Sequence, residues 1–241
     1  MSKKYYIGCS GYYYSAWKNK FYPNTIQPKE WLRYYSTIFN SVELNGTFYR
    51  TPRLSDLKRY REQTGGEFRF SVKMSKAITH IGRLNESAEQ IAGFQKLIKE
   101  GLGNKLNYFL FQMPPSFHYT TENLDRIIKN IPHDPENVIE FRHLSWWKDE
   151  VIEELRKAKL TFCNIDYPGL DTWFITTSPH FYLRLHGNPQ LFKSSYSTDK
   201  LKKFYAAFPK ENKDFTIYFN NTYYEAGYTN ASELVKIIEH A

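Results

Sequence analysis

One complete strand–helix–strand unit lies in residues 137–166, which read NVIEFRHLSWWKDEVIEELRKAKLTFCNID. The runs 137–142 and 161–166 are rich in apolar and β-branched residues that alternate with polar ones, a pattern that predicts two strands. Residues 148–159 between them predict a helix. A strand, a helix and a second strand in this order are typical of a parallel sheet whose strands are connected by helices.

The same unit repeats along the whole chain of 241 residues. Strands are predicted at residues 5–10, 41–45, 68–74, 107–113, 137–142, 161–166, 181–186 and 215–220. Helices are predicted at residues 28–39, 53–64, 86–100, 124–131, 148–159 and 201–208, and in a final segment for which Asn230 is the expected N-cap and Glu233 its capping-box partner. No linker-like stretch divides these units, so the sequence predicts one α/β domain over residues 1–241, a (β/α)8 TIM-like barrel. An open doubly wound sheet is the alternative fold.

The connection between the sixth and seventh strands is expected to be irregular. It contains Pro168-Gly169 and Ser178-Pro179, which leave little room for a helix. A long loop is also predicted at residues 75–85, after the third strand. That loop would lie at the end of the barrel where barrel enzymes place their sites.

Composition narrows the class of protein. A hydrophobic fraction of 41% with 24% charged residues is that of a globular protein and excludes a disordered chain. Since no apolar run is long enough to span a bilayer and the N-terminus shows no signal peptide, we expect a cytoplasmic protein without a membrane partner. Cys9 and Cys163 match no metal or disulfide pattern and are expected to be buried thiols. The net charge of +8 suggests anionic partners, nucleic acid among them, and the oligomeric state is left open.

Alternate residues of a barrel strand face the surrounding helices and the interior. One set is apolar and is expected to face the helices: Ile7, Cys9, Val42, Leu44, Phe70, Val72, Phe109, Phe111, Ile139, Phe141, Cys163, Ile165, Leu183, Leu185, Ile217 and Phe219. The other set is polar and is expected to point into the barrel: Ser10, Glu43, Asn45, Ser71, Lys73, Gln112, Glu140, Arg142, Asn164, Asp166, Arg184, His186 and Asn220. Because unpaired charges are costly to bury, this interior predicts a site at the barrel mouth. Its cations and carboxylates nearly balance, which places the surplus positive charge on the outer surface.

Two interpretations of the inward polar groups remain open. They form either a structural network of ion pairs, or a pocket in which cations hold an anionic substrate while a carboxylate or a histidine moves a proton. The candidate catalytic residues of such a pocket are Glu43, Lys73, Glu140, Asp166 and His186. Lys73 is either a Schiff-base or electrophilic lysine or the ion-pair partner of Glu43 or Glu140. His186 is either a general acid or base or a hydrogen-bonded structural residue, and the separation of Glu140 and Asp166 is not fixed by their spacing.

No cofactor is predicted. Carboxylates interleaved with cations, and the absence of paired His or Cys motifs, disfavour a catalytic divalent metal. By analogy with other barrels, phosphate is expected at the loops that begin at residues 186–188 and 220–222. Aromatic residues, Trp17 and Tyr49 among them, are expected near the mouth, where they either stack on bases or sugars or pack the loops.

A set of motifs is specific in combination: GCSG at 8–11, FNSVELN at 39–45, FSVK at 70–73, QMPPSF at 112–117, EFRH at 140–143, YLRLHG at 182–187 and YFNN at 218–221. With these motifs the chain resembles the YecE-like family, a domain of unknown function, over residues 7–234. Gly46 departs from the family, in which a Ser more often follows the Asn. The resemblance implies a TIM-like barrel and no established reaction. It implies these ligand-binding candidates: Asn45, His80, Gln112, Arg142, His143, Arg184, Asn220 and Asn221.

The leading hypothesis is therefore an enzyme, of hydrolase, isomerase or lyase type, that acts on a phosphorylated or nucleotide-like anion at the barrel mouth. One alternative is a nucleic-acid-binding protein without catalysis that uses the basic exterior and the aromatic rim. Another is a structural barrel without a small ligand.

Overall fold

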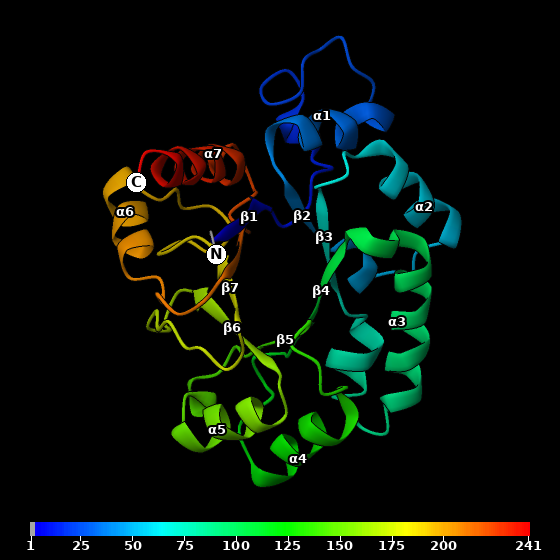
Figure 1. Cartoon of the computed structure of the whole chain (residues 1–241), viewed down its shortest axis with the longest axis vertical. Helices are drawn as coiled ribbons and strands as arrows, with labels where there is room; N and C mark the ends of the chain where they lie inside the picture. The colour runs from blue at the N-terminus through cyan, green and yellow to red at the C-terminus, as the bar shows by residue number, and fades with distance from the viewer. Residues whose placement is uncertain (1–2) are drawn as a thin grey trace.

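A single curled sheet forms the centre of the protein. The computed structural model describes residues 3–241 and gives the strands β1 (Lys4–Cys9), β2 (Ser41–Leu44), β3 (Arg69–Lys73), β4 (Leu106–Gln112), β5 (Asn137–Glu140), β6 (Thr161–Asp166), β7 (His180–Leu185) and β8 (Asp214–Phe219). They are parallel, in the order β1-β8-β7-β6-β5-β4-β3-β2, and β1 returns to β2 to close a barrel (Figure 1). This order confirms the predicted TIM-like barrel and excludes the doubly wound sheet.

The helices surround the sheet (Figure 1). They are α1 (Trp31–Ile38), α2 (Leu54–Gln63), α3 (Ala88–Leu102), α4 (Thr121–Asn130), α5 (Asp149–Lys157), α6 (Thr198–Ala206) and α7 (Ala226–Glu239). Short helical turns are η1 (Ser15–Trp17), η2 (Pro28–Glu30), η3 (Gly46–Phe48), η4 (Ala77–Ile81), η5 (Gly103–Lys105) and η6 (Leu144–Trp146). The apolar residues of the strands pack against the apolar stripes of these helices, as Phe109 and Ile127 do in one continuous core.

Helix α7 begins earlier than the capping motif predicts. It starts at Ala226, so Asn230 lies inside the helix and is not its N-cap. The side chain of Asn230 is buried; its Oδ1 accepts from the backbone N of Tyr196 at 2.9 Å and its Nδ2 donates to the Tyr196 carbonyl at 2.8 Å. The prediction was wrong because this amide pairs with a neighbouring loop and not with its own helix.

The connection between β6 and β7 is irregular, as predicted. Residues 167–179 form no helix, and a coil fills the space between α5 and α6 in the ring (Figure 1). Asn164 holds this coil, because its Nδ2 donates to the Ile175 carbonyl at 3.1 Å and its Oδ1 accepts from the Ile175 N at 2.7 Å. A side chain of β6 thus replaces the contacts that a helix would make.

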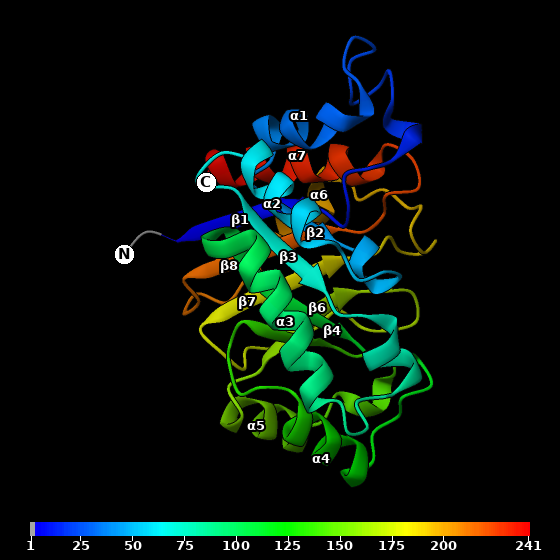
Figure 2. The same cartoon turned by 90° about the vertical axis from the view of Figure 1, so that its right-hand side faces the viewer.

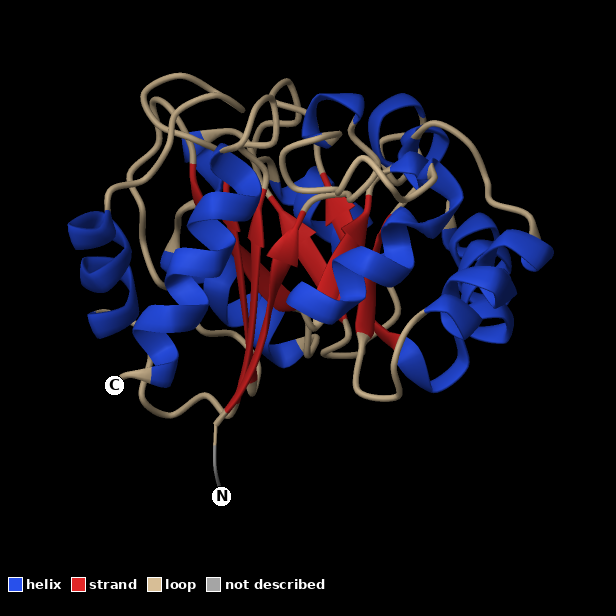
Figure 3. Cartoon of the chain, turned by 90° about the horizontal axis from the view of Figure 1, so that it is seen from above, coloured by secondary structure: helices blue, strands red, loops and turns tan. Residues whose placement is uncertain are grey.

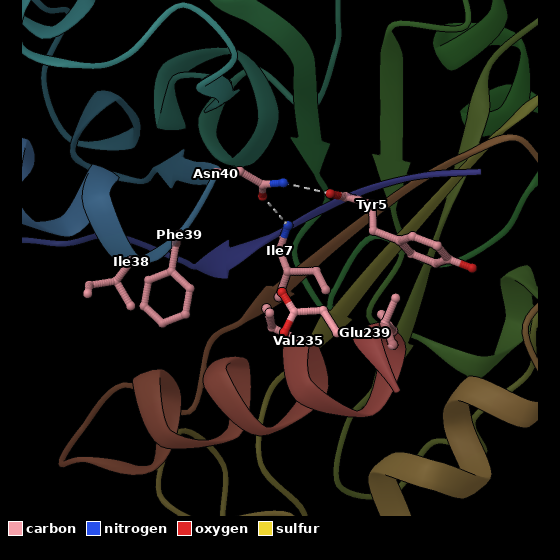
Figure 4. Close-up of a pocket in the computed structure, with 8 residues that line it drawn as sticks. Tyr5, Ile7, Ile38, Phe39, Asn40, Val235 and Glu239 are labelled. Carbon is pink, nitrogen blue, oxygen red and sulfur yellow. Dashed lines mark hydrogen bonds between the residues drawn. The ribbon is translucent and has the colours of Figure 1, made fainter. Parts of the chain in front are cut away.

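Side chains complete the closure between β1 and β2. The two strands share one parallel bridge, between Ser10 and Glu43. Below it, the amide of Asn40 accepts from the Ile7 N at 2.9 Å and donates to the Tyr5 carbonyl at 2.7 Å (Figure 4). Asn40 therefore supplies to β1 the hydrogen bonds that a neighbouring strand would supply.

Gly8 allows the close approach of the same two strands. The hydroxyl of Tyr35 lies between them, accepting from the Cys9 N at 2.7 Å and donating to the Ser41 carbonyl at 3.1 Å. A Cβ atom on Gly8 would lie 1.9 Å from the carbonyl oxygen of Ser41. Any side chain at this position would force the strands apart.

All strands point the same way, so their carboxyl ends share one face of the barrel. Long loops gather on this face, and both termini lie at the opposite end (Figure 2 and Figure 3). In barrels of this type the loops after the strands build the site. None of the helices formed by residues 3–241 is long and apolar enough to cross a membrane.

Candidate functional site

Apolar and aromatic side chains fill the lower part of the barrel interior. They form a cluster separate from the main core, made of Tyr108, Leu110, Val138, Cys163, Ile165, Tyr182 and Tyr218. The Tyr218 hydroxyl lies 3.0 Å from Ser71 Oγ and also bonds Ser41 Oγ across the barrel. The interior is therefore packed at its base, and its polar groups gather toward the carboxyl ends of the strands.

Strand β6 has the opposite orientation from the predicted one. Cys163 and Ile165 face the interior, whereas Asn164 and Asp166 face outward, so the prediction that these two polar residues point into the barrel is wrong. No helix of the described residues follows β6 before β7, and the coil that takes its place needs polar partners. Strand β6 supplies those partners with its outward side chains, and its inward side chains pack in the apolar interior.

Asp166 therefore belongs to a loop anchor and not to the barrel interior. Its carboxylate accepts from Thr172 Oγ1 at 2.8 Å, from the Tyr196 hydroxyl at 2.7 Å and from Lys200 Nζ at 3.3 Å. Tyr196 also accepts from the Gly187 N at 2.8 Å. These contacts fix the loop after β7, residues 187–197.

Glu43 lies at the centre of the barrel and is fully buried. It accepts from Ser10 Oγ at 2.7 Å, from the Tyr182 hydroxyl at 2.7 Å, and from Arg184 Nη2 at 2.6 Å and Nε at 3.1 Å. Four donors satisfy both oxygens of this carboxylate. Tyr182 shares the orientation of Arg184 in β7, so the alternation of that strand could have revealed this partner.

Glu140 is the second buried carboxylate, also with no exposed surface. It accepts from Arg184 Nη1 at 2.5 Å and from Arg142 Nε, and Cys163 Sγ lies 3.7 Å away. Burial alone would raise its pKa, but the two guanidinium groups hold the pKa of Glu140 well below its usual range. Glu140 is therefore an ionised anchor for both arginines and not a proton donor near neutral pH.

His186 supports the same network from β7. Its Nε2 lies 3.3 Å from Arg142 Nη2 and its Nδ1 lies 2.8 Å from the Asn220 amide. Burial and the nearby Arg142 charge lower the pKa of His186 well below its usual range, so the ring is neutral. The neutral ring lies between the Arg142 guanidinium and the Asn220 amide and links the two.

Above this network lies a cavity of about 440 Å³ at the barrel mouth. It is lined by Asn45, Phe48, Tyr49, Lys73, Lys76, His80, Gln112, Pro115, Arg142, Arg184, Phe192 and Asn220. Four lining residues are Lys or Arg, and within residues 3–241 no Asp or Glu lines it. The buried Oδ1 of Asn45 has no hydrogen-bond partner in this part of the chain. The lining thus presents four cationic side chains to the cavity.

Lys73, at the end of β3, does not form the ion pair with Glu43 or Glu140 that was one of its two predicted roles. None of the carboxylates of residues 3–241 pairs with it, because Glu43 and Glu140 are both held by Arg184. Its Nζ donates to Gln112 Oε1 at 2.8 Å and lies 4.1 Å from the centre of the Phe48 ring. Burial, with the nearby Arg184 charge, lowers the pKa of Lys73 to about 7.

His80 reaches the cavity from η4. Its Nδ1 lies 3.0 Å from Thr79 Oγ1, its Nε2 lies 3.5 Å from Gln112 Nε2, and its ring stands edge-on to Phe48. Burial and the charge of Lys73 lower the pKa of His80 to about 4, so the ring is neutral beside the lysine. Gln112, between Lys73 and His80, contacts both.

The structure sorts the predicted site residues into three groups. Those that line the cavity are Asn45, Tyr49, Lys73, His80, Gln112, Arg142, Arg184 and Asn220. Those that lie beneath it and hold the arginines are Glu43, Glu140 and His186. Those that do not reach it are Trp17, His143, Asp166 and Asn221.

The residues of the third group have other contacts. Trp17 is fully buried and donates to the Tyr224 carbonyl at 2.8 Å. His143 stacks on His118 with ring centres 3.9 Å apart, and its Nδ1 lies 2.8 Å from Ser145 Oγ. Asn221 is buried and donates to the Ser194 carbonyl at 2.9 Å.

Phe48, expected among the aromatic residues near the mouth, lines the cavity, and three lining residues were not predicted there: Lys76, Pro115 and Phe192. Lys76 lies in the long loop predicted after the third strand, and that position was the available signal. Phe192 adopts φ 65° in the loop after β7, and no local pattern marks it. Among the described residues no three His, Cys, Asp or Glu side chains come together as metal ligands would, whereas the cationic lining suits an anion.

Comparison with known proteins gives one consistent family. The family model described as "Protein of unknown function DUF72" matches residues 6–241. The UPF0759 protein YunF of Bacillus subtilis is 29% identical over 156 residues, 62% of this chain and 54% of YunF. The UPF0759 protein YecE of Escherichia coli is 31% identical over 86 residues, 36% of this chain and 31% of YecE. The matches thus span about half of YunF and about a third of YecE.

Solved structures resemble the fold over nearly its whole length. A DUF72 family protein from Thermotoga maritima has a TM-score of 0.88 at 28% identity and covers 98% of this chain and 99% of its own. A DUF72 family protein from Enterococcus faecalis has a TM-score of 0.82 at 18% identity over 98% of this chain and 95% of its own, which shows the fold alone.

Proposed function

The chain belongs to the DUF72 family of proteins of unknown function, and from its cavity we propose that it is an enzyme acting on a small anion, phosphorylated or nucleotide-like, by acid/base chemistry at the barrel mouth. We also propose that the protein is cytoplasmic, because both of its cysteines are buried free thiols.

The observation that carries the proposal is the lining of the cavity. A volume of about 440 Å³ lies in the range of small-molecule sites. Lys73, Lys76 and Arg142 line it without a carboxylate from residues 3–241, so an entering anion meets no repulsion from the lining. The loops after β7 and β8 contribute Phe192 and Asn220, as loops do in barrels that bind phosphate.

The network beneath the cavity assigns different roles to its residues. Arg142 is held by Glu140 and His186, so its guanidinium binds the anion without having to be ordered first. Lys73 has a pKa of about 7, so it is the cavity-lining group whose protonation changes near neutral pH. Glu43 holds Arg184, and Arg184 in turn holds Glu140, the partner of Arg142. Hydrolysis, isomerisation and carbon–carbon cleavage are all compatible with these roles.

Ligand binding to the full chain tests the proposal. Inorganic phosphate and a nucleoside monophosphate should raise the Tm of the protein, and Arg142→Gln should abolish that rise. Lys58→Gln, which removes an exposed cation of α2 away from the cavity, is the control and should leave the rise unchanged. Absence of a shift with both compounds contradicts the proposal. Salt-sensitive oligonucleotide binding that survives Arg142→Gln favours the nucleic-acid alternative.

A further inference from the structure

We propose that Lys73 forms a Schiff base, and that the substrate is an aldehyde or ketone which also carries a phosphate or a carboxylate. This inference rests on the proposed function, because it requires the anion to bind in the same cavity.

The position of Nζ supports a nucleophilic role. Lys73 is partly buried at the end of β3, lines the cavity, and has no ion pair with any carboxylate of residues 3–241. An ion pair would hold the amine in its protonated, unreactive form. The hydrogen bond to Gln112 Oε1 at 2.8 Å uses one Nζ hydrogen and leaves the lone pair for a carbonyl carbon in the cavity. The pKa of about 7 gives a large neutral fraction at neutral pH.

A second buried lysine shows what a structural role looks like in this protein. Lys105 Nζ donates to the Arg61 carbonyl and the Thr64 carbonyl, both at 2.6 Å, and to Thr64 Oγ1 at 3.0 Å. Its three hydrogens are satisfied, and it lines no part of the cavity. Lys73 has one side-chain acceptor and faces open volume, so its burial is not explained by structural hydrogen bonding.

The rest of the lining fits a carbonyl compound with an anionic group. Lys76 and Arg142 supply charge for the anion, while Phe48 and Phe192 supply apolar wall beside the amine. Asn45 and Gln112 add side-chain amides to the same lining, which suit a hydroxyl of the substrate.

The condensation balances with one proton taken up and one water released. The neutral Nζ attacks the carbonyl carbon, a C–N bond forms, the carbonyl π pair moves to oxygen, and one Nζ proton passes to that oxygen to give a carbinolamine. A proton from solvent then allows the hydroxyl to leave as water while the nitrogen lone pair forms the C=N bond. Each iminium formed takes up one proton and releases one water, and the reverse addition of water frees the product.

Reductive trapping on the full chain tests the inference. The protein is treated with pyridoxal 5′-phosphate and cyanoborohydride, which reduces an iminium carbon to a stable secondary amine, and labelled lysines are located by peptide mass spectrometry. Lys73 should be labelled at least about tenfold faster than the exposed Lys76 and Lys58, a ratio that corresponds to about 1.4 kcal/mol. Its rate should reach half-maximum near pH 7, whereas the exposed lysines should follow a pKa near 10.4.

Competition separates this inference from the proposed function. Inorganic phosphate should slow labelling of Lys73 and leave Lys58 unchanged, and pyridoxal without its phosphate should label Lys73 about tenfold more slowly. If phosphate raises the Tm but Lys73 is labelled no faster than Lys58, the Schiff base is refuted and the anion site stands. If Lys73 is labelled selectively without protection by phosphate, the anion site is refuted. In Lys73→Arg and Lys73→Met, the fast phase should disappear while the slow labelling of other lysines remains.

Discussion

Replacing Lys73 by Met should stabilise the fold at and below neutral pH. The lysine pKa is about 7 in the folded protein against its usual 10.5, so between these values the unfolded chain binds a proton that the folded chain does not. The stability of the native protein therefore rises with pH through this window. Below about pH 7 the full cost of burying the amine is present, and above about pH 10.5 it is gone. A methionine of similar length fills the same space and has no ionisable group.

The magnitude follows from the same two pKa values. At 1.36 kcal/mol per pKa unit, the interval from 10.5 to about 7 corresponds to roughly 5 kcal/mol for a fully desolvated amine. Lys73 is only partly buried, so solvent screening reduces the expected gain to about 2–3 kcal/mol. For a chain of this size such a gain raises Tm by about 5–10 °C. Residues of functional sites commonly lower the stability of the fold that carries them.

Thermal and urea denaturation of native protein and Lys73→Met at pH 6, 8 and 10 measure the effect. The difference in Tm should be largest at pH 6 and should shrink toward zero at pH 10. Lys76→Met, at an exposed position of the loop that follows β3, should leave Tm within about 1–2 °C at every pH. If Lys73→Met lowers Tm at pH 6, or if the difference does not depend on pH, the lysine is stabilised by its surroundings and this reasoning is refuted.

Three further changes test the network and the scaffold. Arg184→Met should destabilise the fold by about 3–5 kcal/mol in urea denaturation, because it leaves two carboxylates buried without their shared guanidinium; a loss below about 1 kcal/mol contradicts that role. Gly8→Ala should prevent soluble expression or lower Tm by more than about 10 °C, since its Cβ would lie 1.9 Å from the Ser41 oxygen, whereas Gly65→Ala, with nothing within 4 Å, should be tolerated. Tyr196→Phe should cost about 1–2 kcal/mol and speed hydrogen exchange in residues 187–195, with unchanged exchange there counting against the Asp166 anchor.

The strands and most helices were predicted because their signals are local. Alternation and helical spacing record which side of each element is covered, and in a barrel every element is covered on a fixed side. The helix between β6 and β7 was correctly omitted, because Pro and Gly act on the backbone at their own positions. The start of α7 was predicted wrongly from Asn230. An N-cap motif is only a preference, and here the side chain of Asn230 forms a long-range hydrogen bond with Tyr196 instead.

The site was predicted less completely. In β6 the polar set, Asn164 and Asp166, was expected to face inward, but the apolar Cys163 and Ile165 face the interior, so alternation alone gave the wrong side for this strand. Asn164 and Asp166 form hydrogen bonds with the coil that follows β6, and these contacts place Asp166 outside the barrel interior. Asn221 belongs to a motif of the resemblance and Trp17 was expected near the mouth, yet both are buried and contact loops, because a sequence pattern identifies a position and not its exposure.

By itself the sequence determined the barrel, the end at which polar groups gather, and most of the residues around the mouth, since these depend on periodicity within single elements. Only the tertiary structure decided how the charges pair. Arg184 reaches both Glu43 and Glu140, which leaves Lys73 without a carboxylate, and that result depends on distances across the barrel between residues far apart in the chain. The same distances show that Glu43 and Glu140 lie beneath the cavity and hold Arg184 and Arg142, which line it together with Lys73 and Lys76.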